Sequence, residues 1–370
     1  MKSELTSLDL YYLVREFQAL VGARIDKVYE QDTDKNEFLF IFHKSGVGKL
    51  MLRFNLPGIV YLTEYKQVFP DTPPGFCVFL RKHLASARIK EVRQKGFERI
   101  LELVFDTKAG IRILICELFS KGNMVLVDEE YKIRGLLKPQ NWQARTIRGG
   151  IKYEYPPTQP DTPSVSEEQI KDIIINSKKD SVVKTLAIDL GLGGLYAEEL
   201  CMRAGIDKDK KKLNDDELKK LFKELKGLFS EEIKAYKINN EVLPFKLKIF
   251  GQNKQDSYDS FNQALDDVLT EKVVKEVEAK VVKEKQSKED KVSLIVKKQE
   301  ERVKDLEKSI TDNQRKGELI YEHYNEVKDL LENINADRKK MSWDDLKKKY
   351  KSNKLIKSID EKKGLIILDI

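Results

Sequence analysis

The sequence predicts an α+β protein, with an N-terminal mixed α/β domain, a small helical domain and a long coiled-coil arm. Three observations carry this prediction. Short β-rich apolar runs separated by Gly and Asn fill residues 24–127, four prolines mark residues 156–168, and charged residues dominate after residue 265. We therefore expect a domain over 1–160, a helical domain over 165–235, and strands over 236–265 that pack back on the first domain. Residues 266–370 follow as a coiled-coil arm and the start of a further, incomplete domain, because no returning helix follows the arm.

The first domain begins with a helix. Apolar residues recur at helical spacing between Leu8 and Leu20, Thr6 or Ser7 can cap the start, and Gly22 would end it. The remaining apolar runs predict a meander of antiparallel strands in two sets, separated by an amphipathic helix over 76–84. The expected strands cover residues 25–29, 38–42, 50–54, 60–62, 89–94, 99–105, 111–118 and 123–127.

The second half of the chain changes character twice. Residues 186–201 predict two helices joined by a glycine hairpin, and 244–250 predict a further strand. Residues 271–320 contain 14 Lys or Arg and 12 Asp or Glu, and apolar residues recur there in steps of three and four. This pattern predicts a helix of roughly 60 residues, about 90 Å long. Its expected seam consists of Val292, Val296, Val303, Leu306, Ile310, Ile320, Tyr324, Val327 and Leu331.

The composition excludes several classes of protein. The chain is 35% charged with a net charge of +7, which only tilts the expected partners toward anions. It has no apolar run of membrane-spanning length and no signal-peptide pattern, and three scattered cysteines suit a reducing cytoplasm. The histidines and cysteines lack metal-binding spacing, so we expect no metal, cofactor or membrane partner. The Gly-rich run at residues 45–49 departs from a phosphate loop at two positions and is expected to be a hairpin turn.

Two features are candidate anion sites. The hairpin glycines Gly191, Gly193 and Gly194 could present backbone N–H groups to a phosphate, or they could simply make a tight turn, and the residues favour neither. A basic run spans residues 79–95, where we favour a phosphate-binding patch over a solvated helix face and an edge strand protected by lysines. That patch would consist of Arg81, Lys82, Arg88, Lys90, Arg93 and Lys95.

Segments spread over most of the chain resemble one family in their order. They are residues 8–16, 22–29, 79–84, 96–100, 117–128, 190–200, 203–207 and 260–265. Together they resemble the NFACT family of ribosome quality-control factors, the RqcH and NEMF type, which includes proteins once named for fibronectin binding. The family's C-terminal NFACT-R domain has no counterpart in this sequence, so we expect a chain that stops before it.

The resemblance implies a fold and an activity. The fold is an N-terminal domain similar to that of formamidopyrimidine-DNA glycosylases, then a helix-hairpin-helix domain, then a coiled coil. The activity is binding to a large ribosomal subunit, its rRNA and proteins, while that subunit still holds a nascent peptidyl-tRNA. Such factors recruit aminoacyl-tRNA, carrying Ala or Ala and Thr, so that the stalled chain gains a C-terminal tail without mRNA. The ribosome makes the peptide bond, so this implies no catalytic residue and no enzyme.

The resemblance also implies site residues. The family's N-terminal tRNA-contacting acidic residue falls on Asp9, and its Asp-Arg pair falls on Glu98 and Arg99, where Glu replaces Asp. With Arg81 and Lys82 these are the expected tRNA-binding residues. From the residues alone, Asp9 could equally stabilise a helix N-terminus, and Glu98 with Arg99 could be an ion pair of small energetic value.

Two other functions stay open. One is a surface adhesin of the fibronectin-binding type, although the sequence shows no signal or anchor for it. The other is a nucleic-acid-binding protein of glycosylase fold without catalysis, because Lys2 stands where those enzymes carry a nucleophilic proline.

Overall fold

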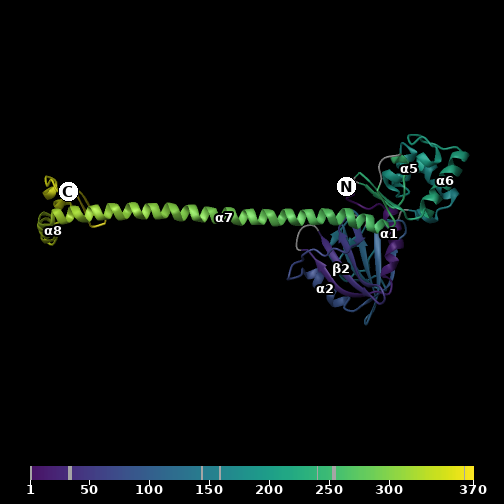
Figure 1. Ribbon diagram of the computed structural model, residues 1–370, viewed down its shortest axis with the longest axis horizontal. Coiled ribbons are helices and arrows are strands. Elements are labelled where there is room, and N and C mark those ends of the chain that lie inside the picture. Colours follow the sequence, from purple (N-terminus) through teal and green to yellow (C-terminus); the bar gives the residue numbers. More distant parts are fainter. Residues whose placement is uncertain are drawn as a thin grey trace. The chain divides into compact units, whose positions relative to one another are not determined.

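The computed structural model divides the chain into two compact units, Met1–Lys275 and Glu276–Ile370 (Figure 1). The structure describes residues 2–31, 36–142, 145–157, 160–239, 241–251, 256–361 and 363–370, without the side chains of 276–285 and 287–288. The proline-rich segment at 156–168 is therefore not where the two units divide. Whether residues 165–235 form a domain of their own stays a prediction.

The first helix, α1 (Ser7–Phe17), forms where the sequence predicts it. Thr6 caps it with a capping box, in which the Thr6 hydroxyl accepts from the Asp9 N–H and the Asp9 carboxylate accepts from the Thr6 N–H. A short 3₁₀ turn, η1 (Gln18–Leu20), continues the helix up to Gly22, which has a φ of +85° and ends it. The apolar face of α1 is fully buried in the main core.

An antiparallel sheet dominates the described part of the first unit. Its nine strands are ordered β4-β3-β2-β1-β5-β6-β7-β8-β9. The eight expected strands are confirmed, with ends that shift by one or two residues. The strands are β1 (Arg24–Glu30), β2 (Glu37–Lys44), β3 (Gly48–Asn55), β4 (Ile59–Leu62), β5 (Arg88–Gln94), β6 (Ile100–Thr107), β7 (Gly110–Glu117), β8 (Asn123–Asp128) and β9 (Ile133–Leu136). Residues 45–47 form the turn between β2 and β3, so the predicted hairpin is confirmed.

Strand β9 is not among the strands predicted from the sequence, and Gly135 explains why. A glycine inside a strand lowers its apparent β propensity. Here the glycine lets helix α2 (Gly75–His83) approach, because a Cβ at Gly135 would lie 2.2 Å from the Phe79 ring. Two further short strands, β10 (Gln140–Asn141) and β11 (Thr146–Ile147), pair with each other.

The middle of the sheet is covered on both faces. On β6, Leu101, Leu103 and Phe105 join the main core with α1 and α2, whereas Ile100 and Val104 join a second apolar cluster. The tyrosines of residues 131–155 cover that second cluster. Because both faces are buried, these strands read as continuous apolar runs rather than as alternating ones.

Four helices lie between residues 167 and 230, and they share the main core with the sheet. They are α3 (Glu167–Asn176), α4 (Val182–Ile188), α5 (Gly193–Ala204) and α6 (Asp215–Ser230). A 3₁₀ turn, η2 (Thr162–Ser164), precedes them, and the buried Thr162 hydroxyl donates to the Leu190 carbonyl at 2.7 Å. Tyr12 of α1 donates to the Leu228 carbonyl of α6 at 2.6 Å, so the sheet and the helices pack as one unit.

The strand predicted over 244–250 is wrong. A separate three-stranded sheet forms from β12 (Ala235–Ile238), β13 (Glu241–Leu243) and β14 (Asp256–Tyr258). Residues 248–250 are instead a 3₁₀ turn, η3 (Lys248–Phe250). The buried Glu199 carboxylate accepts the N–H groups of Lys248 and Ile249 at 2.9 and 3.0 Å, and a strand would not present both to one carboxylate.

The long helix α7 (Phe261–Glu322) confirms the predicted rod of about 60 residues, since it contains 62. Its start is fixed to the first unit by side chains. The Glu16 carboxylate accepts the N–H groups of Phe261 and Asn262, and the Asn262 amide hydrogen-bonds both backbone groups of Leu62 at the sheet edge. Farther along, seam residues such as Val303 and Ile310 are more than half exposed. Pairing of this seam as a coiled coil stays a prediction.

The second unit contains the rest of α7 and a small module. Helix α8 (Tyr324–Arg338), helix α9 (Trp343–Tyr350) and a hairpin of β15 (Ile356–Asp360) with β16 (Leu365–Leu368) follow. Leu330, Ile334 and Leu346 form its core, and Trp343 packs against them.

Candidate functional site

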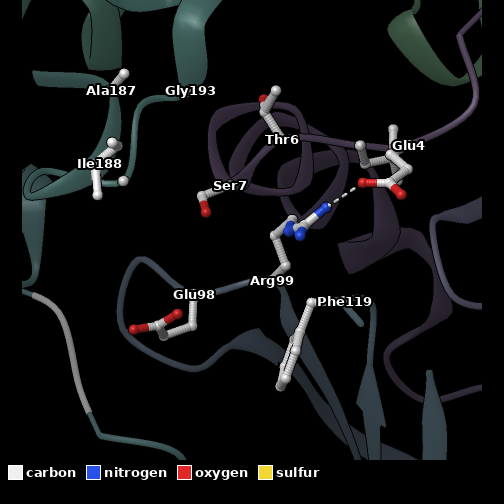
Figure 2. Close-up of a pocket in the computed structure, with 11 residues that line it drawn as sticks. Glu4, Thr6, Ser7, Glu98, Arg99, Phe119, Ala187, Ile188 and Gly193 are labelled. Atoms are coloured by element: carbon white, nitrogen blue, oxygen red, sulfur yellow. Dashed lines mark hydrogen bonds and ion pairs between the residues drawn. The ribbon is translucent and has the colours of Figure 1, made fainter. Parts of the chain in front are cut away.

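A pocket of about 360 Å³ lies in the first unit where three segments meet. The segments are the start of α1, the turn that leads into β6, and the glycine hairpin between α4 and α5 (Figure 2). It is lined by Glu4, Leu5, Thr6, Ser7, Glu98, Arg99, Phe119, Ala187, Ile188, Gly191 and Gly193. The structure thus brings together Glu98, Arg99 and two hairpin glycines, which lie about 90 residues apart in the sequence.

Arg99 supplies the positive charge in this pocket. Its guanidinium Nη1 lies 2.8 Å from Glu4 Oε2, and the two side chains are 30% and 57% exposed. Figure 2 shows the guanidinium between Glu4 and Phe119. An ion pair this exposed contributes about 0–1 kcal/mol, so an incoming anion can compete with Glu4 for Arg99 at little cost.

Glu98 lies beside Arg99 but points away from it. Figure 2 shows the Glu98 carboxylate turned away from Arg99. The backbone around it is fixed, because Gln94 Nε2 donates to the carbonyls of both Glu98 and Ser7, at 2.8 and 2.9 Å. The pocket therefore presents a donor and an acceptor in different directions.

The glycine hairpin needs its glycines for conformation. Gly191 and Gly193 have φ angles of +65° and +74°, which side-chain-bearing residues rarely adopt. A Cβ at Gly193 would lie 3.5 Å from the Thr6 methyl group, so the hairpin approaches the cap of α1 closely. Gly194 does not line the pocket, and a Cβ there would meet open space.

Asp9 is placed differently from the other predicted residues. Its side chain is fully buried and does not line the pocket. Its carboxylate accepts from the Thr6 N–H and hydroxyl and from the Tyr196 hydroxyl at 2.7 Å, and it pairs with the Lys2 ammonium at 2.9 Å. These contacts give Asp9 the role of a helix cap and a buried counter-ion in this structure.

The residues of the predicted basic patch have different surroundings in the structure, and whether they form one phosphate-binding surface stays a prediction. Arg81 donates from Nε to the Val28 carbonyl at 2.7 Å, and neither Arg81 nor Lys82 lines the pocket. Arg93 is held by Glu102 and Glu91, each at 2.7 Å. The segment 84–87 turns the chain between α2 and β5, so the six basic residues are distributed over separate elements.

Sequence reasoning missed the support behind the pocket. Phe119 lines it, and the Arg145 guanidinium lies 5.9 Å from the Phe119 ring and 4.8 Å from the Trp142 ring. Arg145 is buried against Glu117, with Nη1 and Oε1 2.7 Å apart, and the Tyr153 hydroxyl donates to the same oxygen. Burial is the main reason that the pKa of Tyr153 is raised above its ordinary range. The sequence feature that could have indicated this buried support is Glu117, a charged residue near the end of the apolar run 111–118.

Comparisons with known proteins decide the family. The model of the NFACT N-terminal and middle domains matches residues 6–366. The chain belongs to the NFACT family. This NFACT chain is 36% identical over 394 residues to the archaeal Rqc2 homolog aRqcH of Methanocaldococcus jannaschii, a match that covers 100% of the chain and 58% of the relative. It is 25% identical to the human ribosome quality control complex subunit NEMF over 86% of the chain and 33% of that protein.

The NFACT chain therefore spans about a third to three fifths of the curated relatives it matches. Among solved structures, the N-terminal part of the fibronectin/fibrinogen-binding protein from Streptococcus suis is similar, with a TM-score of 0.59 and 26% identity over 72% of this chain and 100% of that one. The fibrinogen binding protein from Staphylococcus aureus has a TM-score of 0.58 at 23% identity, over 70% and 97% of the two chains, and supports the fold alone.

The comparisons confirm the family resemblance and the mixed α+β fold with its large antiparallel sheet. The likeness to glycosylases and the helix-hairpin-helix assignment stay predictions. The described residues contain no group of three or more His, Cys, Asp or Glu side chains suited to a metal ion. None of the helices, within the same residues, combines the length and apolarity that crossing a membrane requires.

Proposed function

We propose that this protein acts in ribosome-associated quality control as a tRNA-binding factor. It would bind the large ribosomal subunit obstructed by peptidyl-tRNA and recruit aminoacyl-tRNA carrying Ala, or Ala and Thr, for mRNA-independent tailing of the nascent chain. Two relatives support this proposal: the human one is named as a subunit of the ribosome quality control complex, and the archaeal one is named as an Rqc2 homolog. The ribosome would form the peptide bond, and this chain would contribute binding and positioning.

The observation that carries the proposal is the meeting of Glu98, Arg99 and the glycine hairpin in one pocket. A guanidinium can donate two parallel hydrogen bonds to a phosphate or to a guanine edge. A carboxylate cannot bind phosphate, but it accepts hydrogen bonds from base amino groups and ribose hydroxyls. A donor and an acceptor facing different directions therefore suit a folded RNA, in which phosphates, sugars and bases lie side by side.

Glu98 replaces the Asp that the family resemblance leads us to expect. The longer side chain places its carboxylate one methylene farther from the backbone. In this pocket the carboxylate points away from Arg99 (Figure 2). We therefore assign Arg99 the larger part in RNA affinity and Glu98 a part in selecting among RNAs.

The direct test is a binding titration of labelled, unfractionated tRNA with the purified chain and its Arg99→Ala variant. Loss of an arginine contact to RNA costs about 1–3 kcal/mol, so affinity should fall about 5- to 150-fold. Arg148→Ala is the matched control, because it removes the same charge from an exposed residue outside the pocket. Equal tRNA affinity for Arg99→Ala, Arg148→Ala and the unchanged chain would contradict the proposal.

A second test identifies the bound RNA. RNA that co-purifies with the chain is sequenced, and one or a few tRNA species together with large-subunit rRNA should be enriched. The similarity to a fibronectin/fibrinogen-binding protein favours one rival function, an adhesin. Saturable binding of fibronectin by a chain that does not enrich tRNA would favour the adhesin instead.

A further inference from the structure

A second basic surface lies over strands β1–β3 and includes none of the residues that line the pocket. Its centre is the half-buried ring of Tyr29. Three cations surround this ring, with Lys66 Nζ at 4.2 Å, Lys27 Nζ at 5.2 Å and the Arg81 guanidinium carbon at 5.4 Å from its centroid. The Phe69 ring lies 5.1 Å away. We call these five residues the Tyr29 surface.

The sheet register builds this surface. Lys27 and Tyr29 pair with Ile41 and Leu39, so all four side chains share one face of β1 and β2. Tyr29 and Phe69 pack on Leu39, Ile41 and Met51, which form a small apolar base. The hydrogen bond from Arg81 to the Val28 carbonyl holds the guanidinium against β1.

The charges of the Tyr29 surface are not balanced within the described chain. Among the described residues, no carboxylate lies within ion-pair distance of Lys27, Lys66 or Arg81. Arg53 of β3 stands opposite Leu39 in the sheet register, so it adds a buried positive charge on the same face. Its Nε has no hydrogen-bond partner among the described residues. Three or four close cations repel one another, and a bound anion would relieve that repulsion.

The pKa of Tyr29 reflects the positive charges that surround its ring. The hydrogen bond from Lys66 Nζ, 3.0 Å from the Tyr29 hydroxyl, is the main cause that lowers the pKa of Tyr29, and the charges of Lys66 and Lys27 add to it while partial burial opposes it. A lowered phenol pKa means that negative charge is stabilised at this position. Because the hydroxyl accepts from Lys66, its own hydrogen can be donated to an anion.

We propose that the Tyr29 surface binds the phosphate backbone of RNA and is a second RNA contact of this protein. Lys27, Lys66 and Arg81 lie on three separate segments, so their charges spread over more than one phosphate position along a polymer. The exposed edges of Tyr29 and Phe69 offer aromatic surface beside these charges, a combination that suits single-stranded or loop RNA. The choice of RNA over other anionic polymers rests on the proposed function. The observations that indicate an anion-binding site at the Tyr29 surface are independent of the pocket residues.

The test measures affinity for labelled, unfractionated tRNA against NaCl concentration with the full chain. Each lysine that contacts a phosphate contributes roughly 0.7–0.9 to the slope of log affinity against log salt. The Lys27→Ala, Lys66→Ala double variant should therefore bind about fivefold to tenfold more weakly at 0.1 M NaCl, with a slope shallower by about 1.5. The control is Lys108→Ala with Lys178→Ala, which removes two exposed lysines and the same charge.

Cross-linking from two exposed positions distinguishes a direct contact with RNA from a general effect of charge. Val68 is 85% exposed between Gln67 and Phe69, and Val47 is 60% exposed in the β2–β3 turn. A photo-reactive benzoylphenylalanine in place of Val68 should cross-link to tRNA, and the same residue in place of Val47 should not. Tyr29→Phe keeps the ring and removes the donor, so it should weaken binding about twofold to fivefold.

Each outcome is informative. If the double variant matches its control in affinity and slope, the proposal is wrong. If it loses binding only to vesicles containing anionic phosphatidylserine, the surface serves a membrane and the RNA proposal is also wrong. If the double variant loses tRNA affinity while Arg99→Ala does not, the Tyr29 surface is supported and the pocket assignment fails. If Arg99→Ala loses tRNA affinity while the double variant does not, the pocket assignment is supported and the proposal for the Tyr29 surface is wrong.

Discussion

Asp9→Asn tests whether Asp9 acts on RNA or on the fold. The buried carboxylate is the counter-ion of Lys2, whose side chain is only 4% exposed and whose remaining hydrogen bond is to the Val242 carbonyl. Asn has nearly the same shape and still accepts from Thr6, so the capping box is largely kept. The main loss is the negative charge beside a buried ammonium group.

Removing one partner of a buried ion pair costs about 3–5 kcal/mol. The Val242 carbonyl still accepts from Lys2, so we expect the lower end, about 3 kcal/mol. With a urea dependence of about 3 kcal/mol per molar, the unfolding midpoint should fall by about 1 M. Asp26→Asn is the matched control, because it removes the same charge from an exposed residue of β1 and should leave the midpoint unchanged.

The two tryptophans make the assay specific to each unit. Trp142 lies in the first unit and Trp343 in the second, and the chain has no other tryptophan. In a Trp343→Phe background, fluorescence therefore follows unfolding of the first unit alone. Adding Lys2→Met to Asp9→Asn should recover most of the lost stability, because it removes the unpaired charge.

The family resemblance implies a different result for the same variant. If the Asp9 carboxylate contacted tRNA directly, Asp9→Asn would lower tRNA affinity and leave the unfolding midpoint within about 0.2 M of the unchanged chain. That outcome would refute the structural reasoning. We expect instead less than a twofold change in tRNA affinity under conditions in which the variant is folded.

Three further predictions concern stability, measured by the same urea titration. Glu117→Gln should destabilise the first unit by about 3 kcal/mol, because it leaves the Arg145 guanidinium buried without its partner. Gly135→Ala should destabilise it by about 1–3 kcal/mol through the clash with Phe79, and Phe79→Leu should restore part of the loss. Burial raises the pKa of Glu30, so the folded state favours its neutral form and stability should decline as pH rises through that raised pKa. The free energy of unfolding of Glu30→Gln, compared with that of the unchanged chain at the same pH, should therefore be more favourable at pH 8 than at pH 5.

The sheet could be predicted from the sequence because its strands carry strong local signals. Runs such as residues 38–42 and 111–118 are apolar, β-rich and bounded by turn residues, which is enough to place a strand without knowing its neighbours. The order of the strands and the covering of both sheet faces depend on contacts between distant segments. The same reason explains the wrong strand at 244–250, where the buried Glu199 carboxylate, from another helix, turns the backbone into a 3₁₀ helix.

The pocket could be predicted in part. The family resemblance implied Glu98 and Arg99, and backbone chemistry separately made the hairpin glycines a candidate anion site; the structure places Glu98, Arg99, Gly191 and Gly193 around one cavity. Phe119 and its buried support from Arg145 were not predicted, because each residue looks like ordinary packing until the fold brings them together. The Tyr29 surface was hidden for a similar reason, since its cations come from three segments and only Lys27 is close to Tyr29 in sequence.

Asp9 and Arg99 show where reasoning from residue type ends. A Thr followed three residues later by a carboxylate is the pattern of a helix cap, and the same carboxylate at a helix start is also well placed to meet a ligand. Spacing cannot separate these two roles, because both need the side chain near the first turn. Burial separates them in this protein: Asp9 is fully buried, whereas Arg99 is 30% exposed and its ion pair within the described residues is with an exposed glutamate. A polar group that is already satisfied inside the fold must break those contacts before it can bind RNA, and a solvent-exposed arginine need not.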